Sequence, residues 1–123
     1  MSDILKDLYE VVETRKAQGE EGSYTAYLFE KGLDKILKKI AEEAGETIIA
    51  AKSLEAALAG GGSAAEEYAL RSELTGEIAD LLYHLVVLQS ALGVDVKLVE
   101  AVLKERSGKT GNLKSQTIVD KNT

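Results

Sequence analysis

Residues 77–88 read Glu-Ile-Ala-Asp-Leu-Leu-Tyr-His-Leu-Val-Val-Leu, and this stretch decides the fold of the chain. At about 100° per residue, a helical projection places Glu77, Asp80 and His84 in one narrow stripe, with apolar side chains over the rest of the circumference. A helix that is apolar on nearly every side belongs in the interior of a bundle or of an oligomer. The stretch therefore predicts a buried helix that carries two carboxylates and the one histidine of the chain.

Apolar residues at helical spacing continue on both sides of this helix. Residues of the kind that cap helices stand at the expected starts, namely Asp3 or Ser2, Ser23, Ser63 and Asp95. Glycines stand where helices should end, at Gly60–Gly62 and Gly93. The predicted helices span roughly residues 4–17, 24–30, 33–58, 64–92 and 96–106.

These helices predict an all-α fold of four to five helices in a single domain, residues 1–106. The polar residues 107–123 are expected to form a flexible C-terminal tail. A lone subunit cannot cover every face of the apolar helix, so we expect homodimerisation to complete the bundle, with Val86 facing outward. The packed faces of the first and third helices are expected to comprise Ile4, Leu8, Val11 and Val12, and Leu33, Ile36, Leu37, Ile40, Ala41, Ala44 and Ile48.

Composition excludes several classes of protein. The chain has 123 residues, 45% of them hydrophobic and 29% charged, which suits one folded domain. A net charge of −6 argues against nucleic-acid binding, and no apolar run is long enough to span a membrane. The N-terminus lacks the basic-then-apolar order of a secretory signal, so we expect a cytoplasmic protein. Without cysteine there is no disulfide, thiolate zinc site or cysteine nucleophile.

The predicted third helix carries the acidic segment Glu42-Glu43-Ala44-Gly45-Glu46. Residues three apart share a helix face, so Glu43 and Glu46 lie side by side at the edge of the apolar stripe. Taken alone, the segment also fits a solvated charged face with ion pairs such as Lys39 with Glu43.

The second acidic pair, Glu77 and Asp80, is harder to assign to a solvated surface. On a buried helix these carboxylates would be desolvated and would repel each other unless they are paired or bind a metal. Neutralisation by lysines remains one explanation. The other is that Glu43, Glu46, Glu77 and Asp80 converge from two packed helices as an all-oxygen site for Mg²⁺ or Mn²⁺.

His84 shares the stripe of Glu77 and Asp80, and we expect it to hydrogen-bond a metal-binding carboxylate rather than to bind the metal itself. The chain lacks the repeated Glu-x-x-His motif of a ferritin-like di-iron site. Tyr83 points nearly opposite to His84 and is assigned to the core or to an interface.

The arrangement Glu-Glu-x-x-Glu, a spacer of about thirty residues and Glu-x-x-Asp resembles the MazG-like all-α nucleotide pyrophosphohydrolases. The segments Ser23-Tyr24-Thr25-Ala26 and Asp80-Leu81-Leu82-Tyr83-His84-Leu85 narrow the resemblance to the phosphoribosyl-ATP pyrophosphatase family of histidine biosynthesis. The resemblance covers roughly residues 8–106, which is nearly the whole predicted domain.

This resemblance implies roles for individual residues. Four carboxylates would hold Mg²⁺, for which Mn²⁺ can substitute: Glu43, Glu46, Glu77 and Asp80. Glu42 would orient a ligand or a water molecule and would complete the catalytic set. The residues implied near the substrate are Arg15, Ser23, Tyr24, Thr25, Lys35 and Lys39, with both lysines at phosphate oxygens.

The implied reaction is Mg²⁺-dependent hydrolysis of phosphoribosyl-ATP to phosphoribosyl-AMP and pyrophosphate, the second step of histidine biosynthesis. Water would attack phosphorus directly, and the family implies a homo-oligomer, which we expect to be a dimer with composite sites. Two alternatives stay open. One is a house-cleaning pyrophosphohydrolase that acts on ordinary or damaged nucleoside triphosphates. The other is a non-enzymatic helical interaction module whose carboxylates are paired with lysines.

Overall fold

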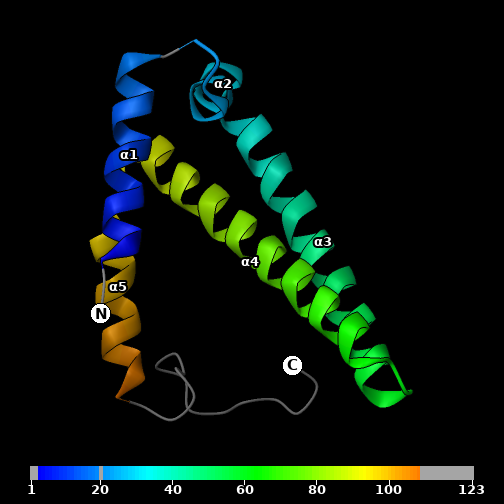
Figure 1. Cartoon of the computed structure of the whole chain (residues 1–123). Helices are drawn as coiled ribbons and strands as arrows, with labels where there is room; N and C mark the ends of the chain where they lie inside the picture. Colours follow the sequence, from blue (N-terminus) through cyan, green and yellow to red (C-terminus); the bar gives the residue numbers. More distant parts are fainter. Residues whose placement is uncertain (1–2, 20, 109–123) are drawn as a thin grey trace.

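A computed structural model describes residues 3–19 and 21–108 of the chain (Figure 1). The helices are α1 (Ile4–Gln18), α2 (Tyr24–Lys31), α3 (Leu33–Ala59), α4 (Ala64–Leu92) and α5 (Val96–Ser107). The described ranges contain five helices and no strand, so the predicted all-α class is confirmed. Most of the predicted tail, residues 109–123, lies outside the described residues.

Local capping chemistry sets the helix boundaries close to where the sequence predicts them. The side chains of Ser23, Ser63 and Asp95 accept hydrogen bonds from the first turns of α2, α4 and α5, as predicted. Asp3 stands at the N-cap position of α1, but its side chain makes no capping hydrogen bond. Gly93 ends α4 with φ of 69°, a left-handed conformation that glycine adopts without strain.

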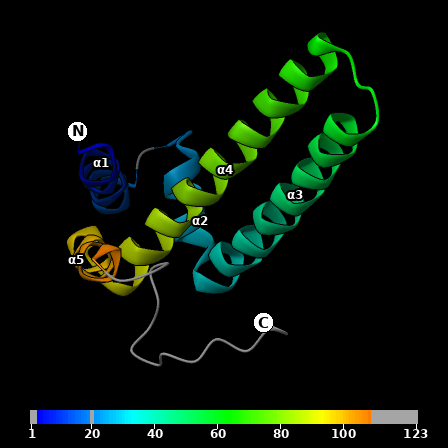
Figure 2. The same ribbon diagram turned by 90° about the horizontal axis from the view of Figure 1, so that it is seen from below.

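The long helices α3 and α4 form an antiparallel hairpin (Figures 1 and 2). The turn between them depends on glycine, because Gly61 has φ of +84° and a Cβ at Gly62 would lie 2.9 Å from the Cβ of Ala57. The turn brings the two acidic segments of the chain onto facing helices.

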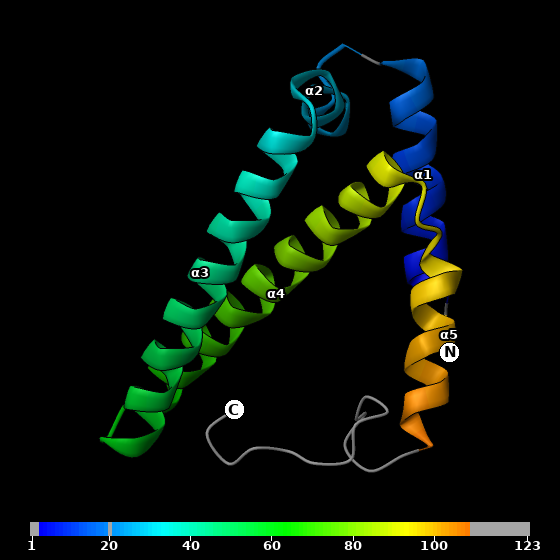
Figure 3. The same ribbon diagram turned by 180° about the vertical axis from the view of Figure 1, so that it is seen from behind.

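The remaining helices gather at the end of the hairpin opposite to its turn. Helices α1 and α5 lie beside the C-terminal end of α4, and α2 connects α1 to the start of α3 (Figure 3). Val86 is only 2% exposed, so the expectation that it faces outward is wrong; it packs within the chain's own core. The buried core draws on all five helices and comprises Val12, Leu28, Ile36, Val86, Val87 and Val96.

Polar contacts join α1 to the last turns of α4. Lys16 donates a 2.9 Å hydrogen bond to the main-chain oxygen of Ser90 and pairs with Glu13 at 2.7 Å. The buried hydroxyl of Ser90 donates to the Glu13 carboxylate. The hydrogen bond from Lys16 holds the pKa of Glu13 below its usual value. Lys16 therefore binds a carbonyl in the last turn of α4, which also accepts a 3.3 Å hydrogen bond from the main-chain N–H of Gly93.

Several residues expected on packed faces are exposed in the single chain. On α1, Val12 is buried and Leu8 half-buried, whereas Ile4 and Val11 are exposed. On α3, Ile36 is buried, but Leu33, Leu37, Ala41 and Ile48 are exposed. The physical reason is that five helices from one chain supply too few neighbours to cover the whole hairpin. Within the described ranges, no helix has the length and the apolar character needed to cross a membrane.

Candidate active site

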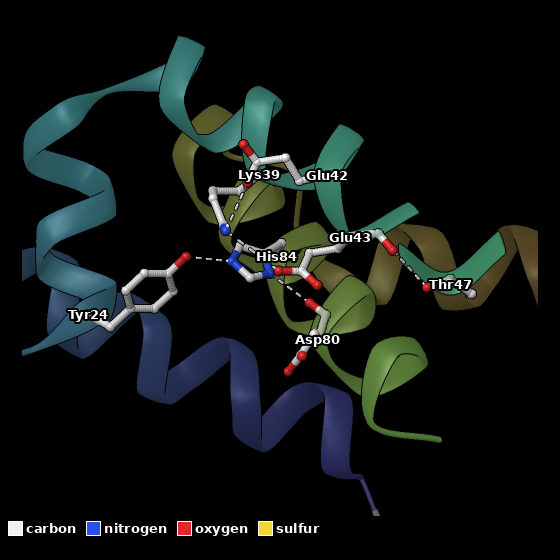
Figure 4. A network of polar contacts seen from close by, with 7 residues as sticks. All are labelled: Tyr24, Lys39, Glu42, Glu43, Thr47, Asp80 and His84. Carbon is white, nitrogen blue, oxygen red and sulfur yellow. Dashed lines mark hydrogen bonds and ion pairs between the residues drawn. The ribbon is translucent and has the colours of Figure 1, made fainter. Parts of the chain in front are cut away.

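Three carboxylates meet between α3 and α4. Glu43 on α3 and Glu77 and Asp80 on α4 each place an oxygen within 4.8 Å of the others. Glu43 is 7% exposed, Glu77 is half-buried and Asp80 is exposed, so the cluster opens to solvent on the side of Asp80. The hairpin thus brings together three of the four carboxylates that the sequence proposes as metal ligands. Figure 4 draws two of them, Glu43 from α3 and Asp80 from α4.

Two oxygens in this cluster are buried without a partner. Glu43 Oε2 and Glu77 Oε2 are inaccessible to solvent and receive no hydrogen bond. Among the described residues, no lysine or arginine forms an ion pair with Glu77 or Asp80. A buried carboxylate without a donor is costly in a folded protein, so this arrangement suits a bound cation.

Glu46 joins the cluster through Glu77. The two side chains are close enough to share a hydrogen bond, which a carboxylate pair can form only if one member keeps its proton. This hydrogen bond raises the pKa of Glu77 to about 7, with further contributions from burial and from the charges of Glu46, Glu43 and Asp80. Without a cation, Glu77 therefore keeps a proton well above the pH at which a carboxyl group ordinarily loses it.

The raised pKa of Glu77 predicts how stability depends on pH. Between about pH 5 and pH 7 the folded protein keeps a proton on Glu77 that the unfolded chain has already lost, so rising pH removes stability through this group. In chelator, the Glu77→Gln variant should therefore gain stability relative to wild type as the pH rises from about 5 to about 8. Denaturant unfolding at several pH values measures this difference. Glu73→Gln, one turn earlier on α4, is the control, and a difference that does not change with pH would contradict the account.

Lysines stand at one border of the cluster. Lys39 pairs with Glu42 at 3.0 Å and with Glu43 Oε1 at 3.7 Å, so the ion pair considered from the sequence is present. The hydrogen bond between Lys39 and Glu42 raises the pKa of the lysine and lowers that of the glutamate. Lys35 is half-buried one turn earlier on α3. Glu42 is thus tied to Lys39 at the rim, while the second oxygen of Glu43 stays unpartnered.

The N-terminus of α2 docks on α4 through two hydroxyl contacts. The Tyr24 hydroxyl lies 2.8 Å from His84 Nε2, and the Thr25 hydroxyl is hydrogen-bonded to that of Tyr83. Ser23 caps α2, and its hydroxyl accepts a hydrogen bond from the main-chain N–H of Ala26. The two segments that narrow the family resemblance therefore contact each other directly.

Two side chains on α4 differ from their expected positions. His84 Nδ1 lies 2.7 Å from the main-chain oxygen of Asp80, so its partner is a carbonyl rather than the carboxylate that we expected. Tyr83 packs against the hydrophobic core, as expected, but it does not point away from His84. The centroids of the two rings lie 5.1 Å apart in an edge-on contact, and the Tyr83 hydroxyl is hydrogen-bonded to that of Thr25. Helical projection gives the direction of a Cβ but not the side-chain torsions, which turn both rings toward α2.

Beside α2 lies an open groove of about 850 Å³ that the sequence did not indicate. Tyr24, Tyr27, Phe29 and Lys16 are among its lining residues. The spacing of Tyr24 and Tyr27 by three, on one face of a short helix, is the signal that could have revealed it. Arg15 lines a hollow of about 200 Å³ that shares Glu21, Gly22 and Ser23 with this groove, and none of the clustered carboxylates is among the lining residues of either.

Comparison with known proteins agrees with this geometry. The phosphoribosyl-ATP pyrophosphohydrolase family matches residues 5–107 of the chain. A phosphoribosyl-ATP pyrophosphatase of Pelotomaculum thermopropionicum is 50% identical over 107 residues, which cover 87% of this chain and 94% of that protein. Proteins of the same name from Listeria welshimeri and Streptococcus sanguinis are 44% and 42% identical over 117 residues, which cover 95% of this chain and 98% of each relative. With its acidic hairpin and a match over nearly all the described residues, the chain belongs to the phosphoribosyl-ATP pyrophosphohydrolase family.

Proposed function

We propose that this chain hydrolyses phosphoribosyl-ATP to phosphoribosyl-AMP and pyrophosphate with the help of Mg²⁺, or of Mn²⁺ in its place. The proposal makes it a cytoplasmic enzyme of the second step of histidine biosynthesis. The names of its relatives support the substrate. The observation that carries the proposal is the pair of buried, unpartnered oxygens Glu43 Oε2 and Glu77 Oε2, because a phosphoryl-transfer site needs a place for a cation.

The donor set fits magnesium. Glu43, Glu77 and Asp80 would hold the ion, and Glu46 would join them when the proton it shares with Glu77 is lost. All four supply carboxylate oxygen, which Mg²⁺ prefers, and none supplies a soft ligand. When bound, the ion would offset the charge of the polyphosphate and polarise the phosphorus that is attacked.

The residues around the cluster have distinct tasks in this proposal. Lys39, held by Glu42, and Lys35 would meet phosphate oxygens at the rim. A carboxylate of the cluster would accept the proton of the attacking water, whose oxygen bonds to the α-phosphorus. The bond from that phosphorus to the α–β bridging oxygen breaks, and pyrophosphate leaves with the bridging oxygen.

We also propose that the protein works as a dimer with composite sites. Apolar side chains are exposed on both helices of the hairpin, including Leu37 and Ile48 on α3 and Ile78 and Leu82 on α4. Leu37 and Ile48 are eleven residues apart, and Ile78 and Leu82 four apart, so each pair lies on one helix face. These stripes lie close to the carboxylates. A second hairpin packed against them would bury their apolar side chains.

The proposed activity is tested by incubating the purified chain with Mg²⁺ and either phosphoribosyl-ATP or a panel of ordinary nucleoside triphosphates, and measuring pyrophosphate. We expect rapid release from phosphoribosyl-ATP, loss of release in excess chelator, and recovery when Mg²⁺ or Mn²⁺ is restored.

Two results would contradict this expectation. Full turnover in excess chelator would exclude the metal assignment. Equal or faster hydrolysis of ordinary triphosphates would exclude phosphoribosyl-ATP as the preferred substrate and would favour the house-cleaning alternative.

A further inference from the structure

The hydrogen bonds of His84 determine which of its nitrogens carries a proton. His84 is 4% exposed, and its Nδ1 lies 2.7 Å from the main-chain oxygen of Asp80. A carbonyl oxygen can only accept a hydrogen bond, so Nδ1 must be the protonated nitrogen. In the neutral imidazole, Nε2 then presents a lone pair.

This tautomer determines the orientation of the Tyr24 hydroxyl. Tyr24 lies 2.8 Å from His84 Nε2, and it must donate its proton there because that nitrogen can only accept. Burial raises the pKa of Tyr24, so the hydroxyl keeps its proton. With the proton committed to His84, the Tyr24 oxygen offers only lone pairs to any other partner.

Tyr24 stands between the charged cluster and the groove. Its hydroxyl is close enough to Lys39 and Glu43 for both charges to act on it, and Figure 4 shows it directed toward the network that ends at Asp80. Tyr24 as a residue is 45% exposed, its ring stacks on that of Tyr27 with centroids 6.2 Å apart, and it lines the groove.

A nucleotide that follows this surface would place its parts in a fixed order. The polyphosphate would lie at the carboxylates and Lys39, and the base would lie along the aromatic side chains of the groove. The sugar joins the two, so it would lie at Tyr24, where its hydroxyls are the hydrogen-bond donors.

We propose that Tyr24 reads a ribose hydroxyl of the adenosine half of the substrate by accepting its hydrogen bond, and that His84 is the positioning residue that imposes this polarity. This inference rests on the proposed function for the identity of the nucleotide. It assigns Tyr24 a role in specificity for ribonucleotides over deoxyribonucleotides, and it requires the ring proton of His84 to lie on Nδ1, toward the main-chain oxygen of Asp80, so that Nε2 accepts from Tyr24.

The tautomer is tested without any activity measurement. His84 is the only histidine, so ¹⁵N-labelled, tag-free protein gives one imidazole spectrum. At about pH 8, without metal or nucleotide, we expect a protonated Nδ1 and a pyridine-like Nε2. The opposite tautomer, or a doubly protonated ring, would overturn the proposal.

Specificity is tested with phosphoribosyl-ATP and its analogues lacking the 2′- or the 3′-hydroxyl of the adenosine ribose. Wild type should prefer the full substrate about tenfold in kcat/KM over at least one analogue, because one hydrogen bond is lost. In Tyr24→Phe this preference should fall to within about twofold. His84→Phe should lose it as well, whereas His84→Gln should keep it, because the Gln oxygen can accept the Tyr24 proton.

Tyr83→Phe is the matched control, because it removes the neighbouring hydroxyl contact between α2 and α4 without touching Tyr24. If Tyr24 serves only to hold α2 against α4, Tyr24→Phe and Tyr83→Phe will change the kcat/KM preference for the full substrate over the analogues to the same extent. That result would show the proposal to be wrong. A wild type that does not distinguish the analogues also overturns it. If phosphoribosyl-ATP is not hydrolysed at all, the proposed function is wrong, but the role of Tyr24 can still be tested. The ratio of the dissociation constants of ATP and its 2′- and 3′-deoxy forms then measures the same preference for the ribose hydroxyl.

Discussion

Replacing Asp80 with Asn should lower turnover by on the order of 10²–10³-fold while leaving the metal-free protein as stable as wild type or more stable. Asp80 lies within 4.8 Å of Glu43 and Glu77, and no described cation pairs with it. In chelator the change removes one of several mutually repelling charges and keeps the shape of the side chain. With Mg²⁺ it removes one ligand of the ion that stabilises charge in the reaction.

Denaturant unfolding in chelator and pyrophosphate release in Mg²⁺ measure the two effects on the same preparation. Asp7→Asn, in the first turn of α1, makes the same chemical change away from the site and should retain full activity. If Asp80 were instead a structural partner of a lysine, its replacement would leave an unpaired ammonium. An Asp80→Asn variant that is less stable but normally active would therefore defeat the metal-site assignment.

Replacing Leu82 with Asp should convert the protein from dimer to monomer and lower activity at least about tenfold. Leu82 is 46% exposed in the single chain, so the change leaves the chain's own core intact. In the proposed dimer the same side chain is covered by the partner, where an unpaired carboxylate is costly. If the sites are composite, separating the subunits also separates their parts.

Sedimentation velocity at micromolar concentration gives the oligomeric state, and circular dichroism shows whether the helices persist. Ser72→Asp adds the same charge at an exposed polar position of α4 and should remain a dimer. A wild-type chain that is monomeric and fully active would contradict the dimer proposal.

The helix boundaries follow closely from the sequence because they depend on local chemistry. Ser23, Ser63 and Asp95 cap the helices that they precede, and Gly93 adopts the left-handed conformation that ends α4. Burial was predicted less well. Val86 is buried although we expected it to face outward, because apolar periodicity does not say which apolar face meets a neighbour within the same chain.

The acidic part of the site was predictable, and its aromatic part was not. Spacing alone places Glu77 beside Asp80, and only the hairpin turn is needed to bring Glu43 to them. The contacts of His84 and Tyr83 depend instead on how α2 docks against α4 and on the torsions of both rings. Neither is encoded in helical periodicity, so the core packing of Tyr83 was predicted, but its contact with α2 and the groove beside α2 were missed.

The central claim is that the carboxylates of α3 and α4 bind a divalent cation, and a titration with Mn²⁺ followed by electron paramagnetic resonance tests it most directly. Free Mn²⁺ gives a signal that weakens on binding, so the assay reports the metal itself and needs no substrate. The account predicts saturable binding to wild type that is competed by Mg²⁺, tightens as pH rises through the pKa of Glu77 near 7, and is strongly weakened in both Asp80→Asn and Glu77→Gln. Binding that is absent in wild type, or equally tight in wild type and both variants, would contradict it.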